Sequence, residues 1–137
     1  MALDLKFAVA LKNAQQDAIT SQLGASAILE LYSGTKATNP DTAIGAQVLL
    51  SSHTCNATFA AAAASGVLTL NAIANGTGTA GAGAGTVATW FRLKTSGGTA
   101  KVDGTVGISG CDLNIDNPNI ATGQTVVISS GTFTNGQ

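Results

Sequence analysis

The residues best suited to nucleophilic chemistry are the single histidine, His53, and a cysteine two positions later, Cys55. A catalytic Cys–His pair requires that the two side chains face each other and that a third group orients the base. The polar residues around them predict a turn at Ser52-His53, between strands over residues 48–51 and 54–59. Adjacent turn residues rarely meet the conditions for catalysis. We therefore interpret His53 as a solvated turn residue and expect that the protein is not an enzyme.

The second cysteine, Cys111, lies far from Cys55 in the sequence, and neither has a partner at metal-ligand spacing. Two states of the pair are compatible with the sequence, a disulfide or two buried free thiols. We favour free thiols, because free cysteine is among the most buried residue types.

Three aspartates, Asp103, Asp112 and Asp116, could converge on a hard cation, since calcium takes several oxygen ligands. Their spacing matches no calcium-binding loop, and Asp112 and Asp116 fall on one face of an alternating stretch. We interpret them as solvated acids and predict no metal site and no cofactor. The glycine-rich stretch 75–85 lacks the Lys-Ser/Thr ending of a phosphate-binding loop, so it predicts a flexible loop or a sheet-edge segment.

The strongest strand signal covers residues 86–95 and includes the only tryptophan, Trp90. Side chains alternate along a strand, which puts Val87, Thr89, Phe91 and Leu93 on one face and Ala88, Trp90, Arg92 and Lys94 on the other. We expect a half-buried central strand whose far end reaches the surface. A small binding patch of Trp90, Arg92 and Lys94 is one interpretation. A core tryptophan with basic residues at the exposed end of the strand is the favoured one.

The hydrophobic pattern places one short helix ahead of many strands. Residues 1–12 alternate between apolar and polar, with Leu3, Leu5 and Phe7 on one side, which predicts a strand or an extended arm. Helical spacing follows over residues 13–23, and Gly24 is placed to end that helix. A helix over residues 3–23 is the alternative.

The rest of the chain predicts short strands separated by turns. Strands are expected over residues 27–32, 67–73, 99–103, 105–108, 112–116 and 124–133, turns at Ser96-Gly97-Gly98, Asp103-Gly104 and Ser109-Gly110, and a surface loop over 36–45. In the last strand, Val126, Ile128 and Phe133 are expected to face inward. Short strands spaced by about 8–12 residues are typical of sandwiches and barrels. The sequence therefore predicts a mainly β, single domain over residues 1–137, an antiparallel β-sandwich of the jelly-roll type.

Composition limits the classes of partner. Charged residues make up 9% of the chain and the formal net charge is −1, against about 25% charged residues in an ordinary globular domain. Without a basic stripe, a nucleic-acid partner is not expected. No stretch approaches the ~20 apolar residues of a membrane helix, and the N-terminus lacks the pattern of a secretory signal. Low net charge suits a protein that sits among copies in an assembly.

Several segments together resemble a family of small proteins encoded by tailed bacteriophages and prophages. They are Ala84-Gly-Thr-Val-Ala-Thr-Trp-Phe-Arg-Leu, Val102-Asp-Gly-Thr-Val-Gly, Ser109-Gly-Cys-Asp-Leu-Asn-Ile and Gly123-Gln-Thr-Val, with Leu31-Tyr-Ser-Gly-Thr-Lys in the first half. The resemblance covers most of the chain from about residue 12. The chain departs from the family pattern at Cys111, where a small residue such as Ala is usual, and in the stretch 75–85, which is longer than usual.

The resemblance implies a virion structural protein, a head decoration or cement subunit that binds and stabilises the lattice of the major capsid protein. Such a subunit would self-associate as a dimer or trimer, bind neither nucleic acid nor membrane, and reach the capsid surface after synthesis in the host cytoplasm. A tail, neck or fibre component that binds a host glycan or another virion protein is the alternative. Leu3, Leu5 and Phe7 are the candidate interface residues if the arm adds to a neighbour; otherwise they complete the domain's own core.

Overall fold

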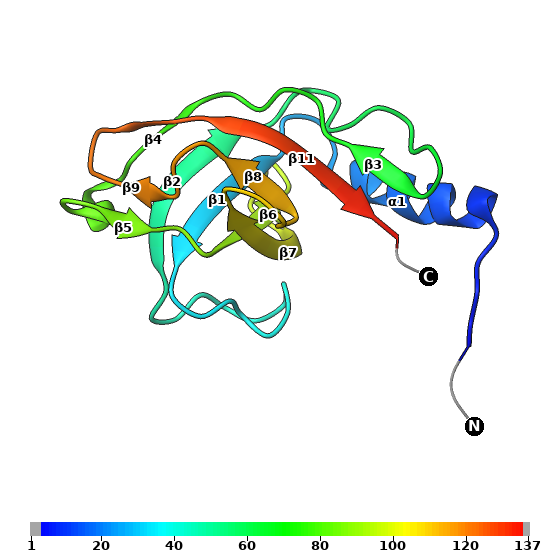
Figure 1. Cartoon of the computed structure of the whole chain (residues 1–137), viewed down its shortest axis with the longest axis horizontal. Coiled ribbons are helices and arrows are strands. Elements are labelled where there is room, and N and C mark those ends of the chain that lie inside the picture. Colours follow the sequence, from blue (N-terminus) through cyan, green and yellow to red (C-terminus); the bar gives the residue numbers. More distant parts are fainter. Residues whose placement is uncertain (1–3, 136–137) are drawn as a thin grey trace.

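The computed structural model describes residues 4–135, which form one α-helix and a mainly β body (Figure 1). The helix is α1 (Val9–Leu23), and a 3-10 turn, η1 (Ala80–Ala82), lies midway along the chain. The strands are β1 (Ile28–Ser33), β2 (Val48–Thr54), β3 (Val67–Thr69), β4 (Gly76–Thr77), β5 (Thr86–Val87), β6 (Trp90–Lys94), β7 (Ala100–Gly107), β8 (Leu113–Ile115), β9 (Asn119–Ile120), β10 (Thr125–Val126) and β11 (Ile128–Thr134). The prediction of a mainly β fold with one N-terminal helix is confirmed.

Seven strands make one mixed sheet in the order β2-β1-β6-β7-β8-β11-β3, and two short ladders pair β10 with β4 and β5 with β9. All neighbours in the large sheet are antiparallel except β7 and β8, so the expectation of a purely antiparallel sheet is wrong. The turn at Ser109-Gly110 lies in the short connection that places β8 beside β7 in the parallel direction. Gly110 there has a positive φ of 69°, and the Cys111 Sγ lies 2.8 Å from where a Cβ on Gly107 would stand.

The large sheet is rolled around its core, because the chain leaving one edge covers the other. Beyond β3, at one edge, the Ala74 N–H donates to the Thr54 carbonyl of β2, and the Thr79 N–H donates to the Leu50 carbonyl. The outer side of β3 is covered in turn by residues 60–64, through bridges of Ala60 to Leu70 and of Ala64 to Val67. Both outer strands of the sheet therefore have backbone partners on their outer side.

Strand β6 lies in the middle of the sheet and is buried on both faces. Phe91 and Leu93 point into the main core, while Trp90 forms a second cluster with Tyr32 and Ala37 on the opposite face. The predicted alternation of faces is thus correct for residues 90–94. The expected exposed far end is wrong for Arg92, which is only 4% exposed, whereas Lys94 at the end of the strand is partly exposed. The strand also breaks before Trp90: β5 pairs with β9, and β6 pairs with β1 and β7.

Two predicted turns lie inside strands. Ser52-His53 belongs to β2, which runs unbroken from Val48 to Thr54, and residues 55–58 are not a strand. Asp103-Gly104 belongs to β7. The glycine is there for packing, because a Cβ on Gly104 would stand 2.5 Å from the Phe91 ring.

Other boundaries follow the prediction closely. The helix ends at Leu23, and Gly24 has a φ of 71° and donates its N–H to the Thr20 carbonyl, as expected for a helix-ending glycine. The hairpin turn at residues 96–98 joins β6 to β7. Both cysteines are free, as predicted, but only Cys55 is buried and Cys111 is partly exposed. The helix begins at Val9, so the extended arm covers only residues 4–8 of the described chain and the predicted arm over 1–12 is too long. Within residues 4–135, no helix has the length and apolar character to cross a membrane.

We predict that Trp90→Ala lowers the free energy of unfolding by ~3–5 kcal/mol, the usual cost of truncating a buried large aromatic side chain. Trp90 is 1% exposed and stacks on Tyr32 with ring centroids 4.8 Å apart. Urea unfolding followed by circular dichroism measures the change. An unchanged unfolding midpoint would contradict the burial of Trp90.

Candidate functional site

His53 is part of a buried polar contact inside β2. Its Nε2 lies 2.9 Å from the Ser51 hydroxyl, and its Nδ1 lies 3.0 Å from the Ala74 carbonyl. Because the carbonyl can only accept, Nδ1 carries the proton and Nε2 accepts from Ser51. Burial lowers the pKa of His53, although the hydrogen bond to Ala74 acts in the opposite direction. The interpretation of His53 as a solvated turn residue is therefore wrong.

This Ser–His contact resembles the start of a catalytic triad, but substrate cannot reach it. Ser51 and His53 are 0% and 1% exposed, and a Cβ on Gly76 would stand 2.7 Å from the His53 ring. Cys55 is also buried, and desolvation raises the pKa of its thiol to about 11. A protonated thiol is a poor nucleophile. The contact joins β2 to the segment around Ala74 and has a structural role.

The three aspartates have separate partners. Asp103 pairs with Arg92, the Asp112 carboxylate accepts from the Thr105 N–H and hydroxyl at 2.9 Å each, and Asp116 accepts from the Ser129 hydroxyl. In the described residues, no three His, Cys, Asp or Glu side chains lie close enough together to hold a metal ion. Each of the three carboxylates is therefore bound to a neighbouring residue of its own and does not share a cation with the others.

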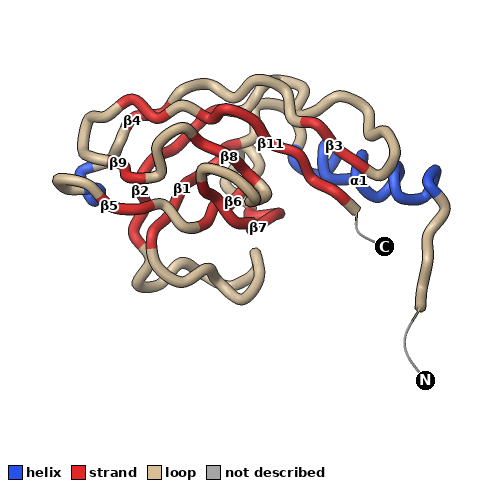
Figure 2. Tube along the Cα trace, viewed as in Figure 1, coloured by secondary structure: helices blue, strands red, loops and turns tan. Residues whose placement is uncertain are grey.

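Arg92, expected at the exposed end of its strand, is the centre of a buried network on the Trp90 face of the sheet. Its Nε and Nη2 donate to the two carboxylate oxygens of Asp103 at 2.7 and 2.8 Å. These hydrogen bonds raise the pKa of Arg92. Its remaining donors reach the carbonyls of Thr42 and Asn39, so they hold the loop between β1 and β2 over the sheet (Figure 2). The guanidinium also lies 5.5 Å from the Trp90 ring centroid.

A second charged pair borders the same network. Lys94 Nζ lies 2.7 Å from one Glu30 oxygen, and the Tyr32 hydroxyl donates to the other at 2.6 Å. Burial, followed by the hydrogen bond to Glu30, raises the pKa of Tyr32. Arg92 and Trp90 are already in contact with partners inside the fold. A binding patch of Trp90, Arg92 and Lys94 is therefore not open to a ligand in this structure.

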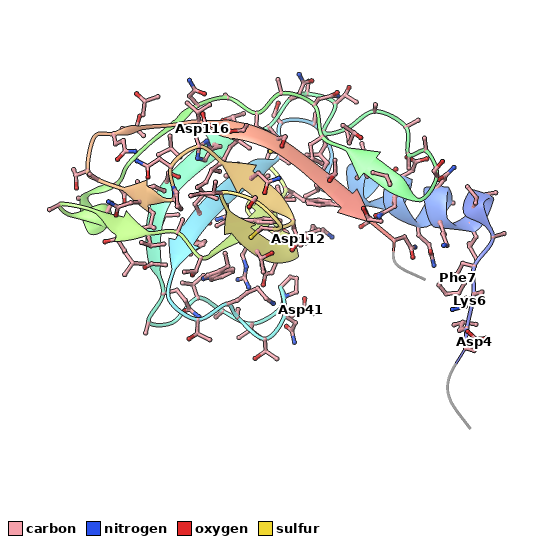
Figure 3. The ribbon with its side chains drawn as sticks, in the orientation of Figure 1. Asp4, Lys6, Phe7, Asp41, Asp112 and Asp116 are labelled. Carbon is pink, nitrogen blue, oxygen red and sulfur yellow. The ribbon has the colours of Figure 1, made fainter. Side chains whose placement is uncertain are left out.

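The N-terminal arm, residues 4–8, leaves the body at the start of α1 (Figures 1 and 3). Asp4 and Lys6 form an ion pair of 2.9 Å, with both side chains 77% exposed. Leu5 is 65% exposed and Phe7 is partly buried. Leu3 lies outside the described residues. The arm thus presents Leu5 to solvent, and Leu5 does not complete the domain's own core.

The helix that follows is attached to the body by one side, which carries polar residues along its first half and the core residues Ile19 and Leu23 near its end. The Asn13 carboxamide oxygen accepts from the Gly66 N–H at 2.8 Å, and the Asp17 carboxylate accepts from the Ala63 N–H at 2.7 Å. Between them, the buried Gln16 donates to the carbonyls of Phe133 and Gly66. The opposite side, here called the outer face of α1, is exposed and comprises Ala10, Leu11, Ala14, Gln15, Ala18, Ser21 and Gln22. Neither acid nor base is among these residues.

The sequence did not reveal that Asn13, Gln16 and Asp17 bind the body. A signal is present, because Asn13, Gln16 and Asp17 share one side and Leu11, Ala14 and Ala18 share the other. Periodicity separates two faces but does not say which of them is buried. An apolar side is normally assigned to the core. Here backbone groups of Ala63 and Gly66 bind the polar residues, while Leu23 on the same side packs in the core.

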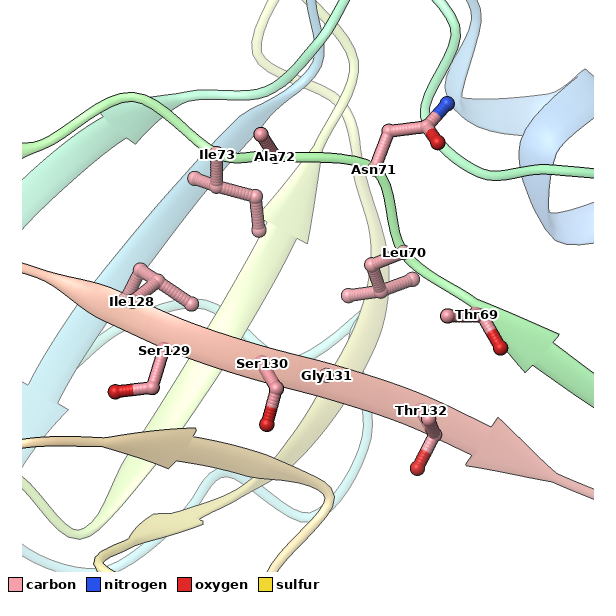
Figure 4. A pocket seen from close by; sticks show the side chains of 10 residues that line it. All are labelled: Thr69, Leu70, Asn71, Ala72, Ile73, Ile128, Ser129, Ser130, Gly131 and Thr132. Atoms are coloured by element: carbon pink, nitrogen blue, oxygen red, sulfur yellow. The ribbon is translucent and has the colours of Figure 1, made fainter.

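Two surface hollows accompany these elements. One lies between β11 and residues 69–73, has a volume of about 240 Å³, and is lined by Leu70, Ile73 and Ile128 together with Ser130 (Figure 4). The other, of about 200 Å³, adjoins the outer face of α1 and is lined by Gln15, Ala18, Ile19, Gln22, Lys101 and Val102. Both are smaller than the roughly 300–1,000 Å³ of a typical small-molecule pocket. Their sizes suit single side chains of a protein partner better than a cofactor.

Comparison with known proteins gives no match: no family model, curated protein or solved structure is similar to this chain.

We predict that the free energy of unfolding decreases as the pH is lowered below about 6.5, the ordinary pKa of histidine. Since the folded-state pKa of His53 is lowered, the unfolded chain binds the proton more readily. The His53 contribution is therefore complete above pH 6.5 and is lost as the pH falls, by at most ~1.4 kcal/mol per pH unit. Urea unfolding at pH 7.5 and pH 5 measures it. The variant His53→Gln should show a smaller loss between the two pH values, and an equal loss would contradict the assignment.

We also predict that Arg92→Ala lowers the free energy of unfolding by ~3–5 kcal/mol, because it leaves the Asp103 carboxylate buried without its charge partner. The Asp103 side chain is 2% exposed. The double variant Arg92→Ala/Asp103→Ala should cost less than the two single variants together, since neither charge is then left unpaired. Urea unfolding of all four proteins tests this, and simple additivity would show that the pair is not coupled.

Proposed function

We propose that this protein is a structural protein of a tailed-bacteriophage virion, a decoration or cement subunit that binds and stabilises the lattice of the major capsid protein. The observation that carries the proposal is the exposed arm, where Leu5 stands 65% exposed on an extended segment beside the charged pair Asp4–Lys6. An extended segment with alternating apolar residues suits addition to a neighbouring protein's strand. The assignment to a phage particle is supported by the sequence segments that resemble phage-encoded proteins.

The character of the body is compatible with this role. The polar side chains best suited to catalysis are buried and bound to each other, as in the pairs Ser51–His53 and Arg92–Asp103. A cement subunit needs neither catalytic group nor cofactor. We place it on the capsid surface after synthesis in the host cytoplasm, as a dimer or trimer, with no nucleic-acid or membrane partner. We also propose that the fold is a jelly-roll-like sandwich, which is supported by the rolled sheet around one main core.

The alternative, a tail, neck or fibre module for a host glycan, is less well supported. Sugar recognition commonly uses an exposed aromatic ring, and the chain has one tryptophan, one tyrosine and four phenylalanines. Trp90, Tyr32 and three of the phenylalanines, Phe59, Phe91 and Phe133, are 9% exposed or less. Only Phe7, in the arm, is partly open. A module that binds another virion protein through the arm is the form of this alternative that the exposure of Leu5 favours.

Immunogold labelling of intact phage particles with an antibody to this protein tests the location. Gold spread over the head is the expected result. Gold confined to the tail or neck would replace the decoration role with the alternative. Unlabelled particles, with the protein present in the lysate, would contradict a virion role.

We predict that Leu5→Asp weakens binding to undecorated capsids, because it removes an apolar contact worth ~1.5–3 kcal/mol when fully buried. Co-sedimentation of the purified protein with capsids measures the affinity. Ile108→Asp is the matched control, since Ile108 is 68% exposed in the loop after β7. Equal weakening by the two changes would contradict an interface centred on the arm.

A further inference from the structure

The outer face of α1 combines an apolar projection with an apolar hollow. Leu11 is 48% exposed near the start of the helix. Toward its end lies the hollow of about 200 Å³, whose walls include Ala18, Ile19 and Val102. Ala14 and Gln15 lie between the two. Of the other exposed large apolar residues of the described chain, Leu5 lies in the arm and Val9 at the first position of α1. Val48, Val87, Ile108 and Val127 are scattered over other elements.

We propose that the outer face of α1 is the contact surface between two copies of this chain, which pack with their helices antiparallel about a two-fold axis near Ala14 and Gln15. In a two-fold interface the same patch serves on both sides, so residue i contacts j and residue j contacts i. Leu11 and Ala18 are about 10 Å apart along the helix at 1.5 Å per residue. An antiparallel copy therefore brings each Leu11 to the other copy's hollow.

The side chains at the centre permit this packing. Ala10, Ala14 and Ala18 follow at helical spacing and are all exposed. Small side chains allow two helices to approach to the short end of the usual 8–10 Å interaxial distance. The larger residue, Leu11, lies toward one end of the face, where it meets the hollow and does not hold the helices apart.

Charge favours a second copy as the occupant. The two charged residues of α1, Lys12 and Asp17, lie on the side toward the body, where Asp17 bonds Ala63 and Lys12 lies against Gly66. Two copies of the outer face therefore meet without like-charge repulsion, which is the first obstacle for a surface that pairs with itself. Lys101, at the rim of the hollow, already donates to Gln22 of its own chain at 3.4 Å.

This inference rests on the self-association included in the proposed function, but it uses a different surface from the arm. The arm supplies the contact with the capsid, and the outer face of α1 supplies the contact between copies. The capsid contact and the contact between copies can therefore be contradicted by separate results. A protein that dimerises as described but does not label particles keeps this inference, and one that labels the head as a monomer loses it.

Analytical ultracentrifugation of the purified full-length protein over a range of concentrations is the first test. We expect a monomer–dimer equilibrium, and we expect Ala18→Glu to raise the dissociation constant by about tenfold or more, because it places a charge in each apolar contact. Glutamate is a good helix former, so the helix is retained, which circular dichroism checks. Ser96→Glu, in the exposed hairpin turn between β6 and β7, is the matched control and should leave the equilibrium unchanged.

Cross-linking tests the position of the axis. In a Cys111→Ala background, Ala14→Cys should form a disulfide-linked dimer under mild oxidation, because the two copies of residue 14 face each other across the axis, and Ser96→Cys should not. A monomer at every concentration would overturn the proposal. So would a trimer, or a dimer that resists Ala18→Glu and gives no cross-link at residue 14.

Discussion

The fold depends on one buried ion pair, Arg92 with Asp103, which lies directly across the β6–β7 hairpin. The register of the hairpin and the position of the pair fix each other. A slip of one residue would turn Arg92 into the main apolar core and Phe91 onto the opposite face, beneath the loop between β1 and β2. The planar guanidinium is suited to this place, because its fork meets both carboxylate oxygens and still has donors for two loop carbonyls. A lysine offers one point charge and cannot make the same set of contacts.

Local pattern was enough to predict much of the fold. The alternation at Phe91 and Leu93, the glycine at the helix end and the hairpin turn at residues 96–98 are short-range features, and they occur as predicted. The failures depend on long-range contacts. His53 can be buried because the distant Ala74 carbonyl accepts a hydrogen bond from its ring. Gly104 is a packing glycine and not a turn residue, because Phe91 occupies the space that a side chain there would need. No local pattern records such a partner.

The candidate surface was predicted in part. The alternation of residues 1–12 indicated the arm, and Leu5 is exposed on it. The helix after it could not be oriented, because the polar residues of α1 bind backbone groups of residues 63–66 and the C-terminal strand. This attachment adds hydrogen bonds to the apolar burial of Ile19 and Leu23, which is the usual way a surface helix is held. It leaves the outer face of α1, with Leu11 and three exposed alanines, free for an intermolecular contact.

The closure of both sheet edges by the chain itself has a consequence for behaviour at high concentration. An uncovered edge strand is a template for runaway strand pairing and fibril growth. With a formal net charge of −1, copies of this chain receive little protection from mutual repulsion. The backbone partners on the outer sides of β2 and β3 provide that protection instead. Crowded copies can therefore remain folded and dispersed without relying on charge.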